Sequence, residues 1–169
     1  MEGEVSRETL FGDIVAAGNA EFETPEWLFR ALDAEFHFEL DVCAMPYNAK
    51  CVRFFTPEQD GLLQPWDQNI CWMNPPYGKE IELWLEKAER ESLLGARVVA
   101  LLPSRTNAPW WNKYVAHSAE EIRFCRGKLT FPNPYGASGV APWGSAVALY
   151  NRFGHCGPTI IGPSLERPA

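Results

Sequence analysis

Two consecutive prolines, Pro75 and Pro76, set the strongest local constraint on the fold of this 169-residue chain. Neither has an amide hydrogen and both fix φ, so neither a strand nor a helix interior can continue through them. The apolar stretch 70–73 precedes them, and a helix-like run begins at residue 80. The sequence therefore predicts a strand over 70–73 that ends in a rigid turn.

The turn Asn74-Pro75-Pro76-Tyr77 carries an amide side chain, backbone carbonyls and an aromatic ring. A planar exocyclic amine, such as that of adenine, is a poor nucleophile because its lone pair is delocalised into the ring. The Asn74 side-chain oxygen and the Pro75 carbonyl oxygen can accept hydrogen bonds from the two N–H groups of such an amine, while the Tyr77 ring stacks on the base. Asn and Pro are also ordinary turn residues, so the four residues alone leave a purely structural interpretation open.

Strand-like and helix-like stretches alternate along the chain. Strands are expected over 38–42, 51–55, 70–73, 97–102, 121–125 and 146–150, and helices over 24–36, 80–94 and 109–117. This alternation predicts an α/β fold, with a mostly parallel sheet and helices on both faces. The last two strands have no helix between them, so we expect an antiparallel hairpin, with 131–144 as a long loop. Ligands in such sheets bind beyond the carboxyl ends of the strands.

Local patterns also predict which helical residues face inward. In the first helix we expect Thr24 as the N-cap and Pro25 as the first helical residue. Its inward residues are expected to be Trp27, Leu28, Ala31 and Leu32. In the second helix the expected buried residues are Ile81, Trp84, Leu85 and Ala88, and the charged residues, including Lys87, should face mostly outward.

The formal net charge of −7 is unevenly distributed. Residues 1–85 carry five Lys and Arg against sixteen Asp and Glu, whereas residues 86–169 carry ten against six. Phosphate contacts normally come from a basic face. The candidate donors in the second half are Arg105, Lys113, Arg123, Arg126, Lys128 and Arg152. Scattered surface charge is the alternative for each of them.

Composition narrows the class of protein further. The length suits a single domain, which we place at residues 21–153, with an arm at 1–20 and a tail at 154–169. The five cysteines form no C-x-x-C pair and the three histidines are isolated, so we expect no metal site. There is no apolar run of 18 residues or more, so we expect no membrane span.

Several segments in a fixed order resemble the phage-type (Dam-like) DNA adenine-N6 methyltransferases over residues 22–150. The matching segments are 24–28, 40–44, 48–50, 55–56, 60–62, 72–78, 101–106, 127–131 and 145–147. The resemblance implies a single, reduced Rossmann-like methyltransferase domain whose last strand is antiparallel. It implies transfer of a methyl group from S-adenosylmethionine to adenine N6 in DNA, with base flipping. A location in the cytoplasm follows, that of a bacterial host if the chain is phage-encoded.

The resemblance also implies which residues bind the cofactor. Thr24 would help bind the methionine carboxylate at a helix N-terminus, and Asp41 would contact the methionine end. Asp60 would contact the adenine or ribose, and the intervening loop is lined by Cys43, Ala44 and Asn48. The Gly-rich loop of many amino-methyltransferases is absent at 43–46, so the residue that binds the ribose stays open between Asp60 and Glu58.

Substrate recognition is expected in the 131–144 loop and the basic segments beside it. The candidate substrate-binding residues are Arg105, Lys128, Phe131, Tyr135 and Trp143. DNA is the expected partner, bound by a monomer or a homodimer. The alternatives are a methyltransferase acting on RNA adenine, cytosine N4 or protein glutamine, and a nucleic-acid-binding module without activity.

Overall fold

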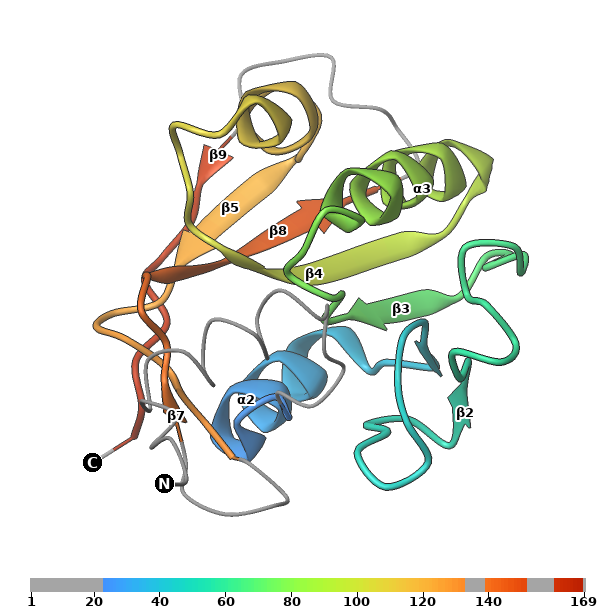
Figure 1. Cartoon of the computed structure of the whole chain (residues 1–169), viewed down its shortest axis with the longest axis horizontal. Helices are drawn as coiled ribbons and strands as arrows, with labels where there is room; N and C mark the ends of the chain where they lie inside the picture. Colours follow the sequence, from blue (N-terminus) through green and yellow to red (C-terminus); the bar gives the residue numbers. More distant parts are fainter. Residues whose placement is uncertain (1–22, 133–138, 152–159, 169) are drawn as a thin grey trace, which may run out of the picture.

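The computed structural model describes residues 23–132, 139–151 and 160–168, and in this part of the chain one seven-stranded sheet forms the centre. Its order is β2-β1-β3-β4-β8-β5-β9 (Figure 1). The strands are β1 (Leu40–Asp41), β2 (Arg53–Phe54), β3 (Ile70–Met73), β4 (Arg97–Pro103), β5 (Glu121–Phe124), β8 (Ser145–Tyr150) and β9 (Ile160–Ile161).

The sheet is mostly parallel, as predicted. Strands β2, β1, β3 and β4 run parallel to one another, and β9 runs parallel to β5. Strand β8 lies between β4 and β5 and is antiparallel to both. The predicted antiparallel pairing of the last two strands is therefore confirmed for β5 and β8.

Helices cover both faces of this sheet, which confirms the predicted layering. Helix α2 (Glu26–Phe36) packs on one face, and helix α3 (Ile81–Leu94) and the π-helix η1 (Trp111–Ala116) pack on the other (Figure 1). Each face of the sheet has its own hydrophobic core, and alternate residues of the central strands pack into one or the other. Cys71 and Met73 face α3, whereas Trp72 faces α2. Because both faces are buried, β4 and β8 are apolar almost throughout.

Helix α2 has the predicted position but not the predicted start. Pro25 occupies the N-cap and has no side-chain capping bond, so Thr24 lies one residue outside the helix and does not cap it. Of the predicted inward residues, Leu28 and Leu32 are buried and Trp27 is half-buried, but Ala31 is exposed, and Phe29 and Phe36 fill the core instead. The larger rings pack against the sheet, which turns Ala31 to the solvent.

Helix α3 buries Ile81, Trp84, Leu85 and Ala88 as predicted, but it also buries Lys87. The Lys87 ammonium lies 2.5 Å from a Glu91 carboxylate oxygen, and both side chains are 6% exposed. The other Glu91 oxygen accepts the Trp66 amide at 3.1 Å, and the Lys87 ammonium lies 5.6 Å from the Trp66 ring centroid. The expectation that Lys87 faces outward was wrong, because Trp66 and Glu91 together give the ammonium a buried partner.

The other connections differ in detail from the sequence expectations. The third predicted helix is mainly the π-helix η1, and the expected loop 131–144 contains part of a two-stranded ribbon, β6 (Thr130–Phe131) with β7 (Gly139–Val140). The domain limits stay a prediction, although β9 lies within the expected tail and pairs with β5. The expected N-terminal arm lies outside the described residues.

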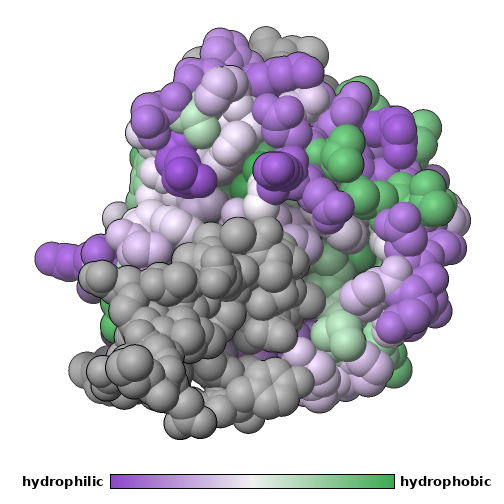
Figure 2. Space-filling model, viewed as in Figure 1, coloured by the Kyte–Doolittle hydropathy of each residue, from purple (hydrophilic) through white to green (hydrophobic). Residues whose placement is uncertain are grey.

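The surface in the view of Figure 2 is mostly hydrophilic, with hydrophobic residues in separate patches. Large exposed hydrophobic side chains on the described surface include Val52, Leu63, Leu83, Leu93 and Leu94. Among the described residues, every helix is too short or too polar to cross a membrane.

The buried pair in α3 gives a first test of this packing. Replacement of Lys87 by Met should lower the free energy of unfolding by about 3–5 kcal/mol, because it leaves the Glu91 carboxylate buried without its cation. The matched control is Arg30→Met in α2, which removes an exposed i,i+4 pair with Glu26 and should cost no more than about 1 kcal/mol. Urea unfolding curves of the two variants measure the difference, and equal losses would contradict the buried pairing.

Candidate active site

The turn Asn74–Tyr77 follows β3 at the carboxyl end of the sheet, and side-chain hydrogen bonds hold it. The Asn74 amide nitrogen donates to Thr24 Oγ1 at 3.2 Å, and Asn74 Oδ1 accepts the Tyr77 hydroxyl at 2.9 Å. The same hydroxyl lies 3.3 Å from the Leu101 carbonyl oxygen on β4. Burial raises the pKa of Tyr77 well above its ordinary value, so the hydroxyl stays protonated and can donate.

These bonds orient the Asn74 side chain. A side-chain carbonyl oxygen has two lone pairs, so Oδ1 can accept a further N–H while it holds the Tyr77 hydroxyl. Thr24 is only 3% exposed and does not cap α2. Its buried hydroxyl instead has Asn74 as its hydrogen-bond partner.

Aromatic side chains from distant segments gather beside Tyr77. The rings of Phe131 and Trp143 each meet the Tyr77 ring edge-on at a centroid distance of 6.5 Å. The exposed Arg105 guanidinium lies 5.6 Å from the Trp143 ring centroid. Three of the five candidate substrate-binding residues, Arg105, Phe131 and Trp143, are thus brought together beside Tyr77, whereas Tyr135 lies outside the described residues.

The proposed phosphate donors separate into two groups. Arg105, Lys113 and Lys128 are exposed. Arg123, in contrast, is 8% exposed and binds both carboxylate oxygens of Glu35, at 2.6 and 2.7 Å, as well as Glu121. The expectation that Arg123 contacts phosphate was wrong, because packing of α2 against β5 supplies it with acidic partners. Arg126 pairs with Glu166 at 2.7 Å, and Arg152 lies outside the described residues.

Asp41 ends β1 and is 3% exposed. Its carboxylate accepts the Lys50 amide at 3.0 Å and the Cys43 amide at 3.4 Å. Burial nevertheless raises its pKa to about 6. It lines a small pocket whose other walls are Glu23, Thr24, Cys43, Asn48, Lys50, Trp72 and Asn74. Four predicted cofactor residues, Thr24, Asp41, Cys43 and Asn48, and the predicted catalytic amide of Asn74 therefore share one pocket.

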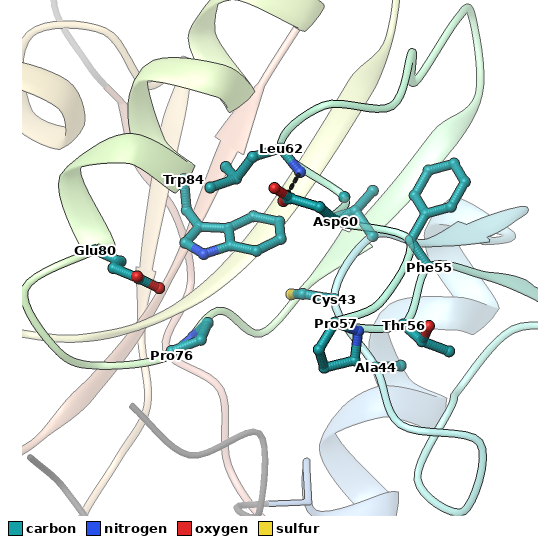
Figure 3. A pocket seen from close by; sticks show the side chains of 12 residues that line it. Cys43, Ala44, Phe55, Thr56, Pro57, Asp60, Leu62, Pro76, Glu80 and Trp84 are labelled. Atoms are coloured by element: carbon teal, nitrogen blue, oxygen red, sulfur yellow. Dashed lines mark hydrogen bonds between the residues drawn. The ribbon is translucent and has the colours of Figure 1, made fainter. Parts of the chain in front are cut away.

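A larger pocket of about 330 Å³ lies alongside, and Cys43 lines both (Figure 3). Its walls include three predicted residues, Cys43, Ala44 and Asp60, together with Pro76 of the turn. Further lining residues are Val42, Phe55, Thr56, Pro57, Gly61, Leu62, Glu80 and Trp84. The size and the mixed apolar and acidic lining are typical of a small-molecule site.

A tight turn places Asp60 in the wall of the larger pocket. Asp60 has a φ of 52°, and its carboxylate accepts the Leu62 amide at 3.1 Å. The following Gly61 passes so close to Val42 that a Cβ would lie 2.1 Å from the Val42 carbonyl oxygen. Only glycine permits this approach. Glu58, the alternative ribose ligand, is exposed and does not line the pocket.

Sequence reasoning missed Glu80 and Trp84 as pocket residues. The helical periodicity predicted that Trp84 is buried but gave no sign that it borders a cavity. The two residues are four apart, at the start of α3, so they lie on the same face one turn apart. That spacing was the available signal, because α3 follows the turn Asn74–Tyr77 closely.

A family model described as "DNA N-6-adenine-methyltransferase (Dam)" matches residues 15–147. The chain belongs to this family. A DNA N-6-adenine-methyltransferase of Haemophilus phage HP1 (strain HP1c1) is 34% identical over 112 residues, which cover 65% of this chain and 65% of the phage protein. A DNA N-6-adenine-methyltransferase of Escherichia phage T1 is 27% identical over 123 residues, which cover 70% of this chain and 51% of that protein. The match thus spans less than two thirds of either relative, and the resemblance to the Dam family is confirmed.

The buried Asp41 predicts a pH dependence of stability for this Dam-family chain. Its carboxyl binds a proton more tightly in the folded than in the unfolded state, so its contribution is complete below its ordinary pKa of 3.8 and is lost as the pH rises through about 6. The loss should approach about 3 kcal/mol by pH 7.

The measurement is urea unfolding of the wild type and of Asp41→Asn, without cofactor, at a series of pH values from about 4 to 7. The stability difference between the two proteins should change in favour of Asp41→Asn as the pH rises. A difference that stays constant with pH would show that Asp41 titrates normally.

Proposed function

We propose that this chain transfers a methyl group from S-adenosylmethionine to the N6 amine of adenine in DNA. The observation that carries the proposal is the placement of the Asn74 amide. Tyr77 and Thr24 orient this amide by hydrogen bonds, and it lines the small pocket together with Asp41, next to the larger pocket. We infer the DNA substrate from the two phage relatives, both of which are named DNA N-6-adenine-methyltransferase. The reaction then takes place where the DNA is, in the cytoplasm of a bacterial host.

The residues of the two pockets fit the proposed methyl donor. Asp41 is a buried acid and suits the ammonium of the methionine end, with Thr24 and Asn48 as polar neighbours. The larger pocket combines apolar walls with Asp60 and Glu80, which suits a nucleoside. It also contains a buried indole N–H of Trp84 that has no partner among the described residues. When bound, the cofactor supplies an electrophilic methyl group on a sulfonium sulfur.

The protein's part in this reaction is positioning. Asn74 Oδ1 and the Pro75 carbonyl oxygen accept hydrogen bonds from the two N–H groups of the target amine and draw its nitrogen towards a tetrahedral geometry, so its lone pair is less delocalised into the ring. The Tyr77 hydroxyl fixes the Asn74 amide, so the acceptor does not have to reorganise during the reaction. No strong base is required, because the nitrogen becomes acidic only after it has gained the methyl group.

The arrangement of strands supports a Rossmann-like methyltransferase fold for this domain. Such a fold has an antiparallel last strand, and β8, the last strand within the predicted domain, is antiparallel between β4 and β5; among the described residues only the short β9 follows it, in the expected tail. The candidate site lies where strands β1 and β3 end, as expected for ligands of open α/β sheets.

DNA would approach the side that carries Tyr77 and Trp143. Arg105 is exposed beside Trp143, so it can contact a phosphate while its guanidinium stays over the ring. The flipped base would enter beside Tyr77. Few basic residues are available on an acidic chain, so DNA binding should be weak, and it should weaken further with salt because its phosphate contacts release counterions.

The direct test is incubation with tritiated S-adenosylmethionine and unmethylated duplex DNA, followed by nucleoside digestion and chromatography. Label should elute with N6-methyl-2′-deoxyadenosine. Label in N4-methylcytosine, or in RNA or protein but not in DNA, would overturn the proposed substrate. Measurable cofactor binding without any transfer would favour a binding module.

Two substitutions separate the proposed roles of the pockets. Asn74→Ala should lower the rate of methyl transfer by about 100-fold or more, since it removes a positioned acceptor, but leave cofactor binding near the wild-type value. Asp41→Ala should do the reverse and lose cofactor affinity first. The measurements are single-turnover rates and calorimetric titration with S-adenosylhomocysteine. Loss of cofactor binding in a folded Asn74→Ala protein would contradict the role given to this amide.

A further inference from the structure

The Trp84 indole presents a buried donor that the described part of the protein does not use. The side chain is 7% exposed and lines the larger pocket, yet its Nε1–H has no hydrogen-bond partner among the described residues. Buried polar groups are nearly always paired, so an unpaired donor at a cavity wall calls for a ligand. At Asp60 and Gly61, in contrast, polar wall atoms have protein partners: the Asp60 carboxylate accepts the Leu62 amide, and the Gly61 carbonyl oxygen accepts the Trp66 indole.

Packing holds the Trp84 ring in this position. The ring stacks on Trp66 at a centroid distance of 6.4 Å and an interplanar angle of 23°. Trp66 is itself fixed, because its indole donates to the Gly61 carbonyl oxygen at 2.9 Å and its amide donates to Glu91. The Trp84 donor is therefore held by its neighbours and cannot easily turn to another acceptor.

The surroundings of this donor define what it can bind. Figure 3 shows the Trp84 ring between Glu80 and Asp60, with its nitrogen on the side of Glu80 and Pro76. A group in that corner meets an N–H donor and a carboxylate acceptor at once. A hydroxyl satisfies both, because it accepts one hydrogen bond and donates another.

We infer that Trp84 selects the methyl donor by a hydrogen bond from its Nε1–H to a ribose hydroxyl, with Glu80 accepting from the same sugar; this inference rests on the proposed function. Pro76 connects this corner to the catalytic turn, so the sugar lies next to the reacting end of the cofactor. The apolar residues Phe55 and Leu62 lie further along the wall and suit the adenine ring (Figure 3). Trp84 and Glu80 thus provide the ribose contacts that were left unassigned in the absence of the Gly-rich loop.

The test combines a substitution in the protein with the removal of single hydroxyl groups from the ligand. Calorimetry compares S-adenosylhomocysteine with its 2′-deoxy and 3′-deoxy analogues, on the wild type and on Trp84→Phe. The wild type should bind one of the deoxy analogues about 5- to 10-fold more weakly than the parent compound. Trp84→Phe keeps an aromatic ring but removes the donor, so its preference for that hydroxyl should shrink towards none. An equal loss of affinity for all three ligands would indicate packing alone and would overturn the inference.

Matched variants control for indirect effects. Glu80→Gln should reduce the same hydroxyl preference, whereas Glu82→Gln, on the exposed side of α3, should leave it unchanged. Trp110→Phe makes the same substitution in the same core, away from the pocket wall, and should retain affinity and preference. An unchanged preference in Trp84→Phe, with the fold preserved by thermal unfolding, would also overturn the inference.

A measurement on the wild-type protein does not depend on the folding of any variant. In ¹⁵N-labelled protein, the assigned Trp84 indole N–H resonance should shift on addition of S-adenosylhomocysteine and shift less with the critical deoxy analogue. Binding of the parent compound without any such shift would reject the role of Trp84 but leave the proposed function intact. Absence of binding by the wild type would instead reject both.

Discussion

The hydrogen bonds of the Asn74 side chain are the interaction on which the candidate site depends. The turn contains Pro75 and Pro76, which have no N–H to donate, so its backbone has few bonds with which to fix itself. Side chains do this instead: Asn74 joins the turn to Thr24, and Tyr77 joins it to Asn74 and to β4. The same bonds that hold the turn therefore also aim the acceptor that the proposed chemistry uses.

The larger pocket depends on a second network behind its wall. The buried pair of Lys87 and Glu91 holds the Trp66 amide, and Trp66 in turn holds Gly61 and stacks on Trp84. Buried ion pairs often add little net stability, because desolvation offsets their attraction. Here the pair fixes two tryptophans that shape the pocket, so its contribution to the site is larger than its contribution to the fold alone.

The acidic character of the chain becomes easier to understand once pairing is considered. Arg123 is bound by Glu35 and Glu121, and Arg126 pairs with Glu166, so part of the positive charge of the second half serves the fold. Arg105 is exposed beside the aromatic group of Tyr77 and Trp143, which places positive charge where the proposed function has the base enter. Local placement of charge, and not its net value, thus decides whether nucleic acid can approach.

The sequence by itself determined the central strands, the positions of α2 and α3, and the edge of the sheet at which the candidate site lies. Strand β3 and helix α3 follow from apolar periodicity and the double proline, and the turn with its order of flanking segments identified the family. These features are local or linear. Only the tertiary structure decided the partners: Thr24 meets Asn74 across 50 residues, Arg123 meets Glu35 across 88, and Trp84 borders a cavity. Periodicity says which face of an element is buried, but the partner of a polar group depends on which other element packs against that face.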